Sequence, residues 1–174
     1  MSRALTLSVL LEQELVTFTR AVGALRRRNF PIKSIAVGPS ASLGLARLTI
    51  MMEADQATAD RAARQLEKII GVREVTAFPA SAGVARELAL VKVRAGHERY
   101  AELLDIALLY KATVLDESSE GTIVEVAGTE AFVLSFLRAL EGFEVLEVAR
   151  SGAVAIERAN GASIPLTFTS EAVQ

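Results

Sequence analysis

The chain has 174 residues, of which 51% are apolar, so it is long enough for one medium domain or two small ones with a substantial core. Its net charge of −2 and its 5% aromatic content give no basis for binding nucleic acid, and the absence of cysteine excludes disulfides and thiolate chemistry. Neither a signal-like segment nor an apolar run of the roughly 20 residues that cross a bilayer is present, so we expect a cytoplasmic protein without membrane contacts.

The first half of the chain alternates strand and helix patterns. Apolar residues at every second position predict strands, and apolar residues spaced by three or four predict helices. In chain order, the predicted elements are a strand at 5–11, a helix at 18–25, strands at 32–37 and 48–52, a helix at 59–69 and a strand at 72–78. Pro31 ends the first helix, and we expect the basic run Arg26–Arg28 before it to complement the helix dipole, with an anion-binding patch as the alternative. Gly38 and Pro39 predict a turn.

The second half repeats this order. Its predicted elements are a strand at 88–93, a helix at 100–108, strands at 112–115 and 122–126, a helix at 133–140 and a strand at 143–148. Small residues at 79–83 predict a linker between the halves. The expected domains therefore span residues 4–79 and 84–158, followed by a weakly patterned tail at 159–174.

A βαββαβ unit is the split βαβ motif, so the sequence predicts an α+β protein built from two tandem ferredoxin-like modules. The two helices of such a module cover one face of its sheet and leave the sheet edges available for pairing. Because each module is small for independent stability, we expect the sheets to associate in a homodimer. The alternative is a monomer whose two modules pack on each other.

Few residues in the chain suit catalysis. The single histidine, His97, lies at the start of a predicted helix, where a solvated or capping role is expected, and no cysteine is available to complete a zinc site. The sequence has no nucleophile elbow, P-loop or dinucleotide-binding glycine motif. Glu12 and Glu14 precede the first helix, where carboxylates ordinarily complement the dipole. The residues favour a binding protein, and an enzyme built on Glu12, Glu14 and His97 is the least supported hypothesis.

The segment between the first strand and the first helix is the candidate binding site. Free backbone N–H groups and the positive end of the helix dipole suit a carboxylate at this position. In a dimer, the segment can meet the second strand of a neighbouring chain. A small amino acid bound there would stabilise one arrangement of the assembly.

Six segments resemble, in order and spacing, the small regulatory subunit of acetolactate synthase (acetohydroxyacid synthase). They are Leu7–Glu12, Arg26–Ser34, Ala46–Ile50, Arg86–Lys92, Ala127–Thr129 and Glu147–Gly152. Each segment alone is a weak signal, but the ordered set is specific. The resemblance covers most of the chain, from about Ala4 to Arg158.

The resemblance implies an N-terminal ACT domain followed by a second ferredoxin-like domain. It also implies a homodimer without catalytic residues that binds and activates the large catalytic subunit of acetolactate synthase, in branched-chain amino acid biosynthesis, and mediates feedback inhibition by valine. Thiamine diphosphate, magnesium and FAD would belong to the catalytic subunit. No cofactor or metal is therefore expected on this chain.

The effector site that the resemblance implies is altered here. The family pattern Glu-Asn-x-x-Gly falls on Glu12, Gln13, Glu14, Leu15 and Val16. Val16 replaces a glycine that lets a ligand approach the backbone, and Gln13 has a longer side chain than the family's asparagine. Pro31, which precedes Ile32 at the start of the second strand, replaces an asparagine and has neither a side-chain amide nor an N–H.

We therefore expect an effector site formed by Gln13, Glu14, Leu15, Val16, Pro31 and Ile32 that responds weakly or not at all to valine. A site re-tuned for another branched-chain amino acid is the milder alternative. A stand-alone ACT-type amino-acid sensor with another partner is the alternative function. The motifs Arg86–Lys92 and Glu147–Gly152 argue against it, because such a sensor needs no second domain.

Overall fold

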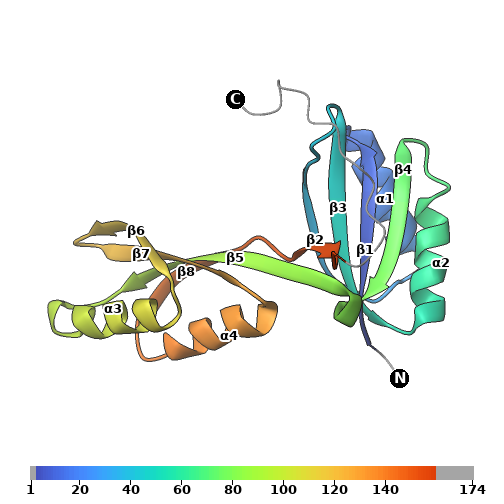
Figure 1. The fold of residues 1–174 in the computed structure, drawn as a ribbon. Helices are drawn as coiled ribbons and strands as arrows, with labels where there is room; N and C mark the ends of the chain where they lie inside the picture. Colours follow the sequence, from blue (N-terminus) through green and yellow to red (C-terminus); the bar gives the residue numbers. More distant parts are fainter. Residues whose placement is uncertain (1–2, 160–174) are drawn as a thin grey trace. The chain divides into compact units, whose positions relative to one another are not determined.

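The computed structural model describes residues 3–159 of the protein and divides into two compact units (Figure 1). Within the described chain, the first unit comprises residues 3–85 and 154–159, and the second comprises Arg86–Ala153. The sequence pattern assigned 84–158 to the second domain, whereas residues 154–158 belong to the first unit. The tail predicted at 159–174 lies outside the described residues, apart from Ala159.

The first unit has the order β1-α1-β2-β3-α2-β4. The bounds are β1 (Arg3–Glu12), α1 (Leu15–Arg27), β2 (Ile32–Pro39), β3 (Leu45–Ala54), α2 (Gln56–Leu66) and β4 (Val72–Pro79). The strands form an antiparallel sheet in the order β2-β3-β1-β4, and both helices cover the same face of it (Figure 1). A short strand, β9 (Val154–Glu157), pairs with β5 (Gly83–Arg94), whose first residues belong to this unit.

Strict alternation along the central strands builds the core of the first unit. Leu7, Val9 and Leu11 of β1 are fully buried beneath the helices, and Ile50 of β3 lies in the same cluster. Each such side chain contributes roughly 1.5–3 kcal/mol by leaving water. The helix α2 presents mainly alanines to this cluster, so that its backbone can lie close to the sheet.

The second unit repeats the same order and sheet topology. Its elements are β5, α3 (Tyr100–Leu109), β6 (Thr113–Ser118), β7 (Gly121–Gly128), α4 (Glu130–Ala139) and β8 (Glu144–Arg150), with a short 3-10 turn at His97–Arg99. Another 3-10 turn, at Ala80–Ala82, belongs to the first unit. The sheet order is β6-β7-β5-β8, and α3 and α4 lie on one face (Figure 1). Phe136, Leu103 and Val91 are fully buried in a separate core. The predicted α+β fold with two tandem βαββαβ modules is therefore confirmed.

The two modules also share the turn that follows their first helix. Asn29 and Lys111 have positive φ angles of 51° and 53°, and each lies just beyond the end of α1 or α3. The N–H of the next residue donates back across the turn, from Phe30 to Leu25 and from Ala112 to Ala107. These are the hydrogen bonds of a Schellman motif at a helix C-terminus. Both modules form this motif, although the side chains at the turn differ.

The structure differs from the sequence prediction in three local features. The helix α2 ends at Leu66 and not at Ile69, because the chain turns there, with Ile69 N–H donating to Leu66 at 3.0 Å. Pro39, predicted in a turn, is the last residue of β2, and β9 was not predicted at all. None of the helices within residues 3–159 is long and apolar enough to span a membrane.

Candidate functional site

The connection between β1 and α1 contains four of the six predicted effector residues. Glu14 is the N-cap of α1, and its carbonyl accepts hydrogen bonds from Thr17 and Phe18 at 3.0 and 3.2 Å. The N–H groups of Leu15 and Val16 donate to no acceptor among the described residues. Because helix N-termini carry partial positive charge, these two donors form a potential carboxylate-binding point.

The side chains around these donors are exposed, and two of the four are apolar. Leu15 and Val16 are 78% and 44% exposed, and Gln13 and Glu14 are also exposed. The Glu14 side chain makes no capping hydrogen bond. An amino-acid ligand at the free N–H groups would therefore meet the branched Val16 side chain beside the backbone.

Two glycines accept hydrogen bonds from this connection, and sequence reasoning did not consider Gly71. The N–H of Glu12 donates to Gly71 O at 2.8 Å, and the N–H of Gln13 donates to Gly44 O at 2.9 Å. Gly71 has φ of +93°, and a Cβ there would lie 2.8 Å from Thr17 Oγ1. Only glycine fits this contact without movement, so Gly71 fixes where β1 ends and α1 begins. Arg73 adds an ion pair to Glu12 at 2.5 Å.

The other two predicted effector residues, Pro31 and Ile32, lie at the opposite end of α1. The helix α1 has 13 residues, of which Leu15 and Val16 belong to the first group, so the rest of the helix separates the two groups by about 17 Å along its axis. The sheet register agrees, because Ile32 pairs with Met52, near the start of β1, while Glu12 ends β1. One chain therefore does not bring the two halves of the predicted site together.

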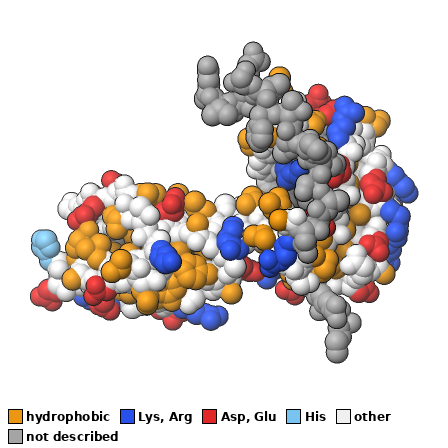
Figure 2. All heavy atoms as spheres, viewed as in Figure 1, with side chains coloured by type: hydrophobic (Ala, Val, Ile, Leu, Met, Phe, Trp, Pro, Cys, Tyr) orange, Lys and Arg blue, Asp and Glu red, His pale blue; other side chains and the backbone are white. Residues whose placement is uncertain are grey.

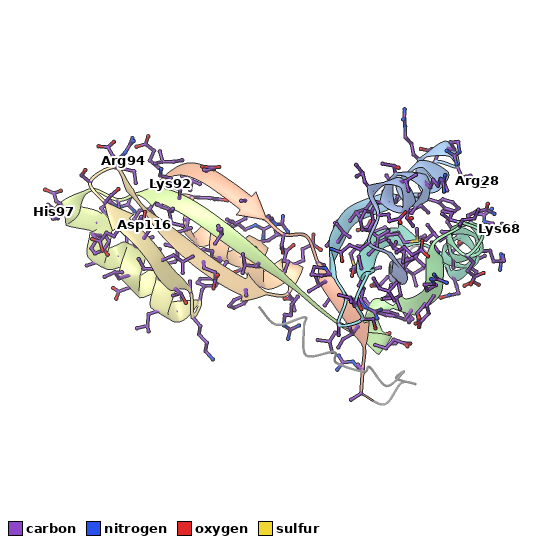
Figure 3. The ribbon with its side chains drawn as sticks, turned by 90° about the horizontal axis from the view of Figure 1, so that it is seen from above. Arg28, Lys68, Lys92, Arg94, His97 and Asp116 are labelled. Atoms are coloured by element: carbon purple, nitrogen blue, oxygen red, sulfur yellow. The ribbon has the colours of Figure 1, made fainter. Side chains whose placement is uncertain are left out.

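The residues considered for catalysis form no site within the described chain. Glu12 pairs with Arg73, and His97 is exposed in the 3-10 turn between β5 and α3 of the second unit (Figure 3). Residues 3–159 contain no cluster of three or more His, Cys, Asp or Glu side chains that could hold a metal ion. Glu12 and Glu14 belong to the first unit and His97 to the second.

Two segments that carry the family resemblance contact each other directly in the second unit. Arg150, from the Glu147–Gly152 segment, forms an ion pair with Glu87, a side chain only 4% exposed in β5. Ser151 makes two hydrogen bonds to Leu88, the residue after Glu87 in β5. Its N–H donates to Leu88 O at 2.9 Å, and its Oγ accepts from Leu88 N at 3.0 Å. These motifs close β8 onto β5, so their role is structural.

The perturbed titratable groups of the second unit are likewise explained by local pairs. The hydrogen bond from Tyr100 to Glu117, at 2.6 Å, raises the pKa of the tyrosine. Arg99 hydrogen-bonds Glu102, which raises the pKa of the guanidinium and lowers the pKa of the carboxyl. Arg99 also lies 4.2 Å from the Phe143 ring centroid, so it fixes α3 against the start of β8.

Comparison with known proteins identifies the family. A family model for the "AHAS small subunit-like ACT domain" matches residues 7–74, and one for the "Small subunit of acetolactate synthase" matches residues 86–159. A probable acetolactate synthase small subunit from Archaeoglobus fulgidus is 34% identical over 89% of this chain and 97% of that protein. The chain belongs to the acetolactate synthase small-subunit family.

Other small subunits agree with this assignment. The acetolactate synthase small subunit from Mycobacterium leprae is 36% identical over 88% of this chain and 90% of that protein. The crystal structure of the acetolactate synthase small subunit from Thermotoga maritima matches with a TM-score of 0.86 and 34% identity, covering 91% of this chain and 99% of that one. As a member of the acetolactate synthase small-subunit family, the protein is a regulatory subunit with a non-catalytic role, and its family implies a large catalytic subunit as partner.

Proposed function

We propose that this small subunit binds the large catalytic subunit of acetolactate synthase and raises its activity in branched-chain amino acid biosynthesis. The observation that supports the proposal is the ordered match of both modules to the small-subunit family, over almost the full length of its relatives. Thiamine diphosphate, magnesium and FAD would be held by the catalytic subunit. This chain would contribute binding surface and regulation.

The proposed effector site lies between two copies of the chain. The free N–H groups of Leu15 and Val16 would face the segment at Pro31 and Ile32 of a second copy, because α1 keeps these two ends apart within one chain. A branched-chain amino acid bound there would stabilise the dimer that holds it. Gln13, Val16 and Pro31 weaken this site for valine through their size and, for proline, the missing N–H donor.

The direct test is acetolactate formation by the cognate catalytic subunit, alone and with this chain, each with and without valine. We expect this chain to raise the turnover and valine to leave the raised rate unchanged. Val16→Gly should introduce valine inhibition, because it removes bulk and frees the backbone beside the two N–H groups. Val16→Ala is the matched control, since it removes bulk without giving glycine's backbone freedom.

The outcomes separate the parts of the proposal. Strong inhibition of the wild-type complex by valine would contradict the weakened site while leaving activation intact. Failure to raise turnover or to co-purify with the catalytic subunit would favour the stand-alone amino-acid sensor. Equal valine responses in Val16→Gly and Val16→Ala would assign the effect to side-chain volume alone.

A further inference from the structure

The first unit contains a cleft lined by three arginines, away from the β1–α1 connection. The cleft has a volume of about 400 Å³ and lies between the α1–β2 turn and the outer face of α2. Its lining residues are Arg28, Asn29, Phe30, Pro31, Thr58, Arg61, Arg64 and Gln65. The volume is within the range of small-molecule sites, and the lining contains no carboxylate.

The arginines come from two elements and converge on one space. Arg61 and Arg64 project from consecutive turns of α2, and Arg28 follows the last turn of α1. Figure 2 shows Lys and Arg side chains in a row along the edge of the unit that α2 forms in Figure 1. Figure 3 shows Arg28 at the outer surface of this unit.

This positive charge is only partly offset within the described chain, where the Asp55 carboxylate interacts electrostatically with Arg61. The side chains of Arg28 and Arg64 form no ion pair or hydrogen bond to another residue of 3–159, and Arg61 donates only to Thr58 Oγ1, at 2.9 Å. The nearby Asp60 accepts a hydrogen bond from Gln56 instead. Like charges that face one cavity repel each other, and a bound anion would reduce that repulsion.

The cleft is also preorganised on one side. The Schellman turn fixes Asn29 and Phe30, whose N–H groups donate to Arg26 and Leu25 at 3.0 and 3.4 Å. Pro31 fixes the next backbone angle and offers no N–H, so a ligand would be recognised by side chains. Guanidinium groups present paired donors that match phosphate and carboxylate oxygens, and Phe30 and Pro31 supply an apolar wall.

We propose that this cleft binds a small molecule carrying several negative charges, as phosphate groups or clustered carboxylates. Such a ligand differs from an amino-acid effector, which has a single carboxylate and no net charge. A concave pocket of this volume fits a small molecule better than an extended acidic protein segment. The site is therefore a second regulatory input to the first unit. Within one chain it is distant from the free N–H groups at Leu15 and Val16, and it shares Pro31 with the proposed effector site.

Calorimetry on the full chain without its catalytic partner tests the proposal, so it does not depend on the proposed activation. Inorganic pyrophosphate and citrate are titrated separately at fixed ionic strength, to distinguish the phosphate from the carboxylate class. We expect saturable binding of at least one. The double substitution of Arg28→Gln and Arg64→Gln should weaken it about 100-fold, or roughly tenfold for each guanidinium removed.

Arg20→Gln with Arg27→Gln is the matched control, because it removes the same charge from α1 residues that do not line the cleft. Arg28→Lys should retain part of the affinity, since it keeps the charge and loses the paired donors. Equal loss of anion affinity in the control and cleft variants would overturn the proposal, because it would show that the anions are attracted by general positive charge and not by the cleft. Absence of saturable binding of both anions would also overturn it, as would a cleft variant that impairs only assembly with the catalytic subunit.

Discussion

Glu87 is a buried carboxylate in β5 of the second unit, and its negative charge is compensated by an ion pair with one residue. Its side chain is 4% exposed, and Arg150, which pairs with it, is about one-third exposed. A buried carboxylate without a counter-charge is costly, so the pair is needed for the closure of β8 onto β5 rather than for surface solubility. The sequence segments containing both residues were identifiable, but their contact was not, because it depends on the register of β8 against β5.

Arg150→Ala is expected to lower the free energy of unfolding by about 2–3 kcal/mol, because it leaves Glu87 buried and unpaired. Arg94→Ala, in strand β5 of the same sheet, is the control. Its partner Glu144 is 2.9 Å away but both side chains are well exposed, so the expected loss is below about 1 kcal/mol. Urea denaturation followed by circular dichroism measures both changes. Equal losses would show that burial of Glu87 is not the source of the effect.

At the scale of elements, the helices α2 and α4 begin with matched caps of different charge. Asp55 Oδ1 accepts from Thr58 N at 2.8 Å, and Thr129 Oγ1 accepts from Phe132 N at 3.2 Å. The hydrogen bonds of Asp55 to Thr58 hold the pKa of its carboxyl below the ordinary 3.8. The cap of α2 is therefore sensitive to acid, while the cap of α4 is not.

The pH dependence of the two caps follows from this difference. A depressed carboxyl pKa contributes stability that is fully present above the unfolded value of 3.8 and is lost as the pH falls through the folded value. The stability difference between wild type and Asp55→Ala should therefore be largest near neutral pH and shrink below pH 3.8. The corresponding difference for Thr129→Ala should not change with pH. Thermal melts across this range measure both, and a constant Asp55→Ala difference would contradict the assigned cap.

Element prediction from sequence succeeded where burial imposes a period and failed where it does not. The strand β1 and the stripe of alanines on α2 each bury one face, so their patterns are visible in the residues. The four residues of β9 are too few to display a period. The end of α2 was predicted three residues late because Ile69 continues the apolar spacing although the backbone has already turned.

At the scale of the whole molecule, the proposed effector site needs two copies of the chain, because α1 separates its two halves within one copy. The sequence proposed both groups of effector residues, but not their separation along α1, because distance within a fold requires the register of the sheet. The cleft residues Arg61 and Arg64 were missed for the same reason, since only packing brings α2 beside the α1–β2 turn. Within the described chain, β2 is an edge strand, with Val37 on it 55% exposed. An exposed apolar edge strand is a ready surface for a second copy.

Val37→Lys is expected to shift the chain from dimer to monomer, because a charge on the edge strand opposes strand pairing. Ile70→Lys is the control, since Ile70 is 82% exposed but lies between α2 and β4. Sedimentation equilibrium measures both variants and the wild type. A monomeric wild type would contradict the homodimer, and equal dissociation of the two variants would place the interface elsewhere.

The pairing of β9 with the start of β5 has a consequence for how the chain is made. The second unit is one continuous segment, Arg86–Ala153, while the first unit includes residues on both sides of it. A ribosome that adds about 5–20 residues per second therefore needs several seconds after β4 emerges before it reaches Val154. During that interval the first unit must persist without β9, although its four-stranded sheet is already complete, and the second unit has time to fold first. The N-terminal unit is then the first to begin folding and the last to be completed.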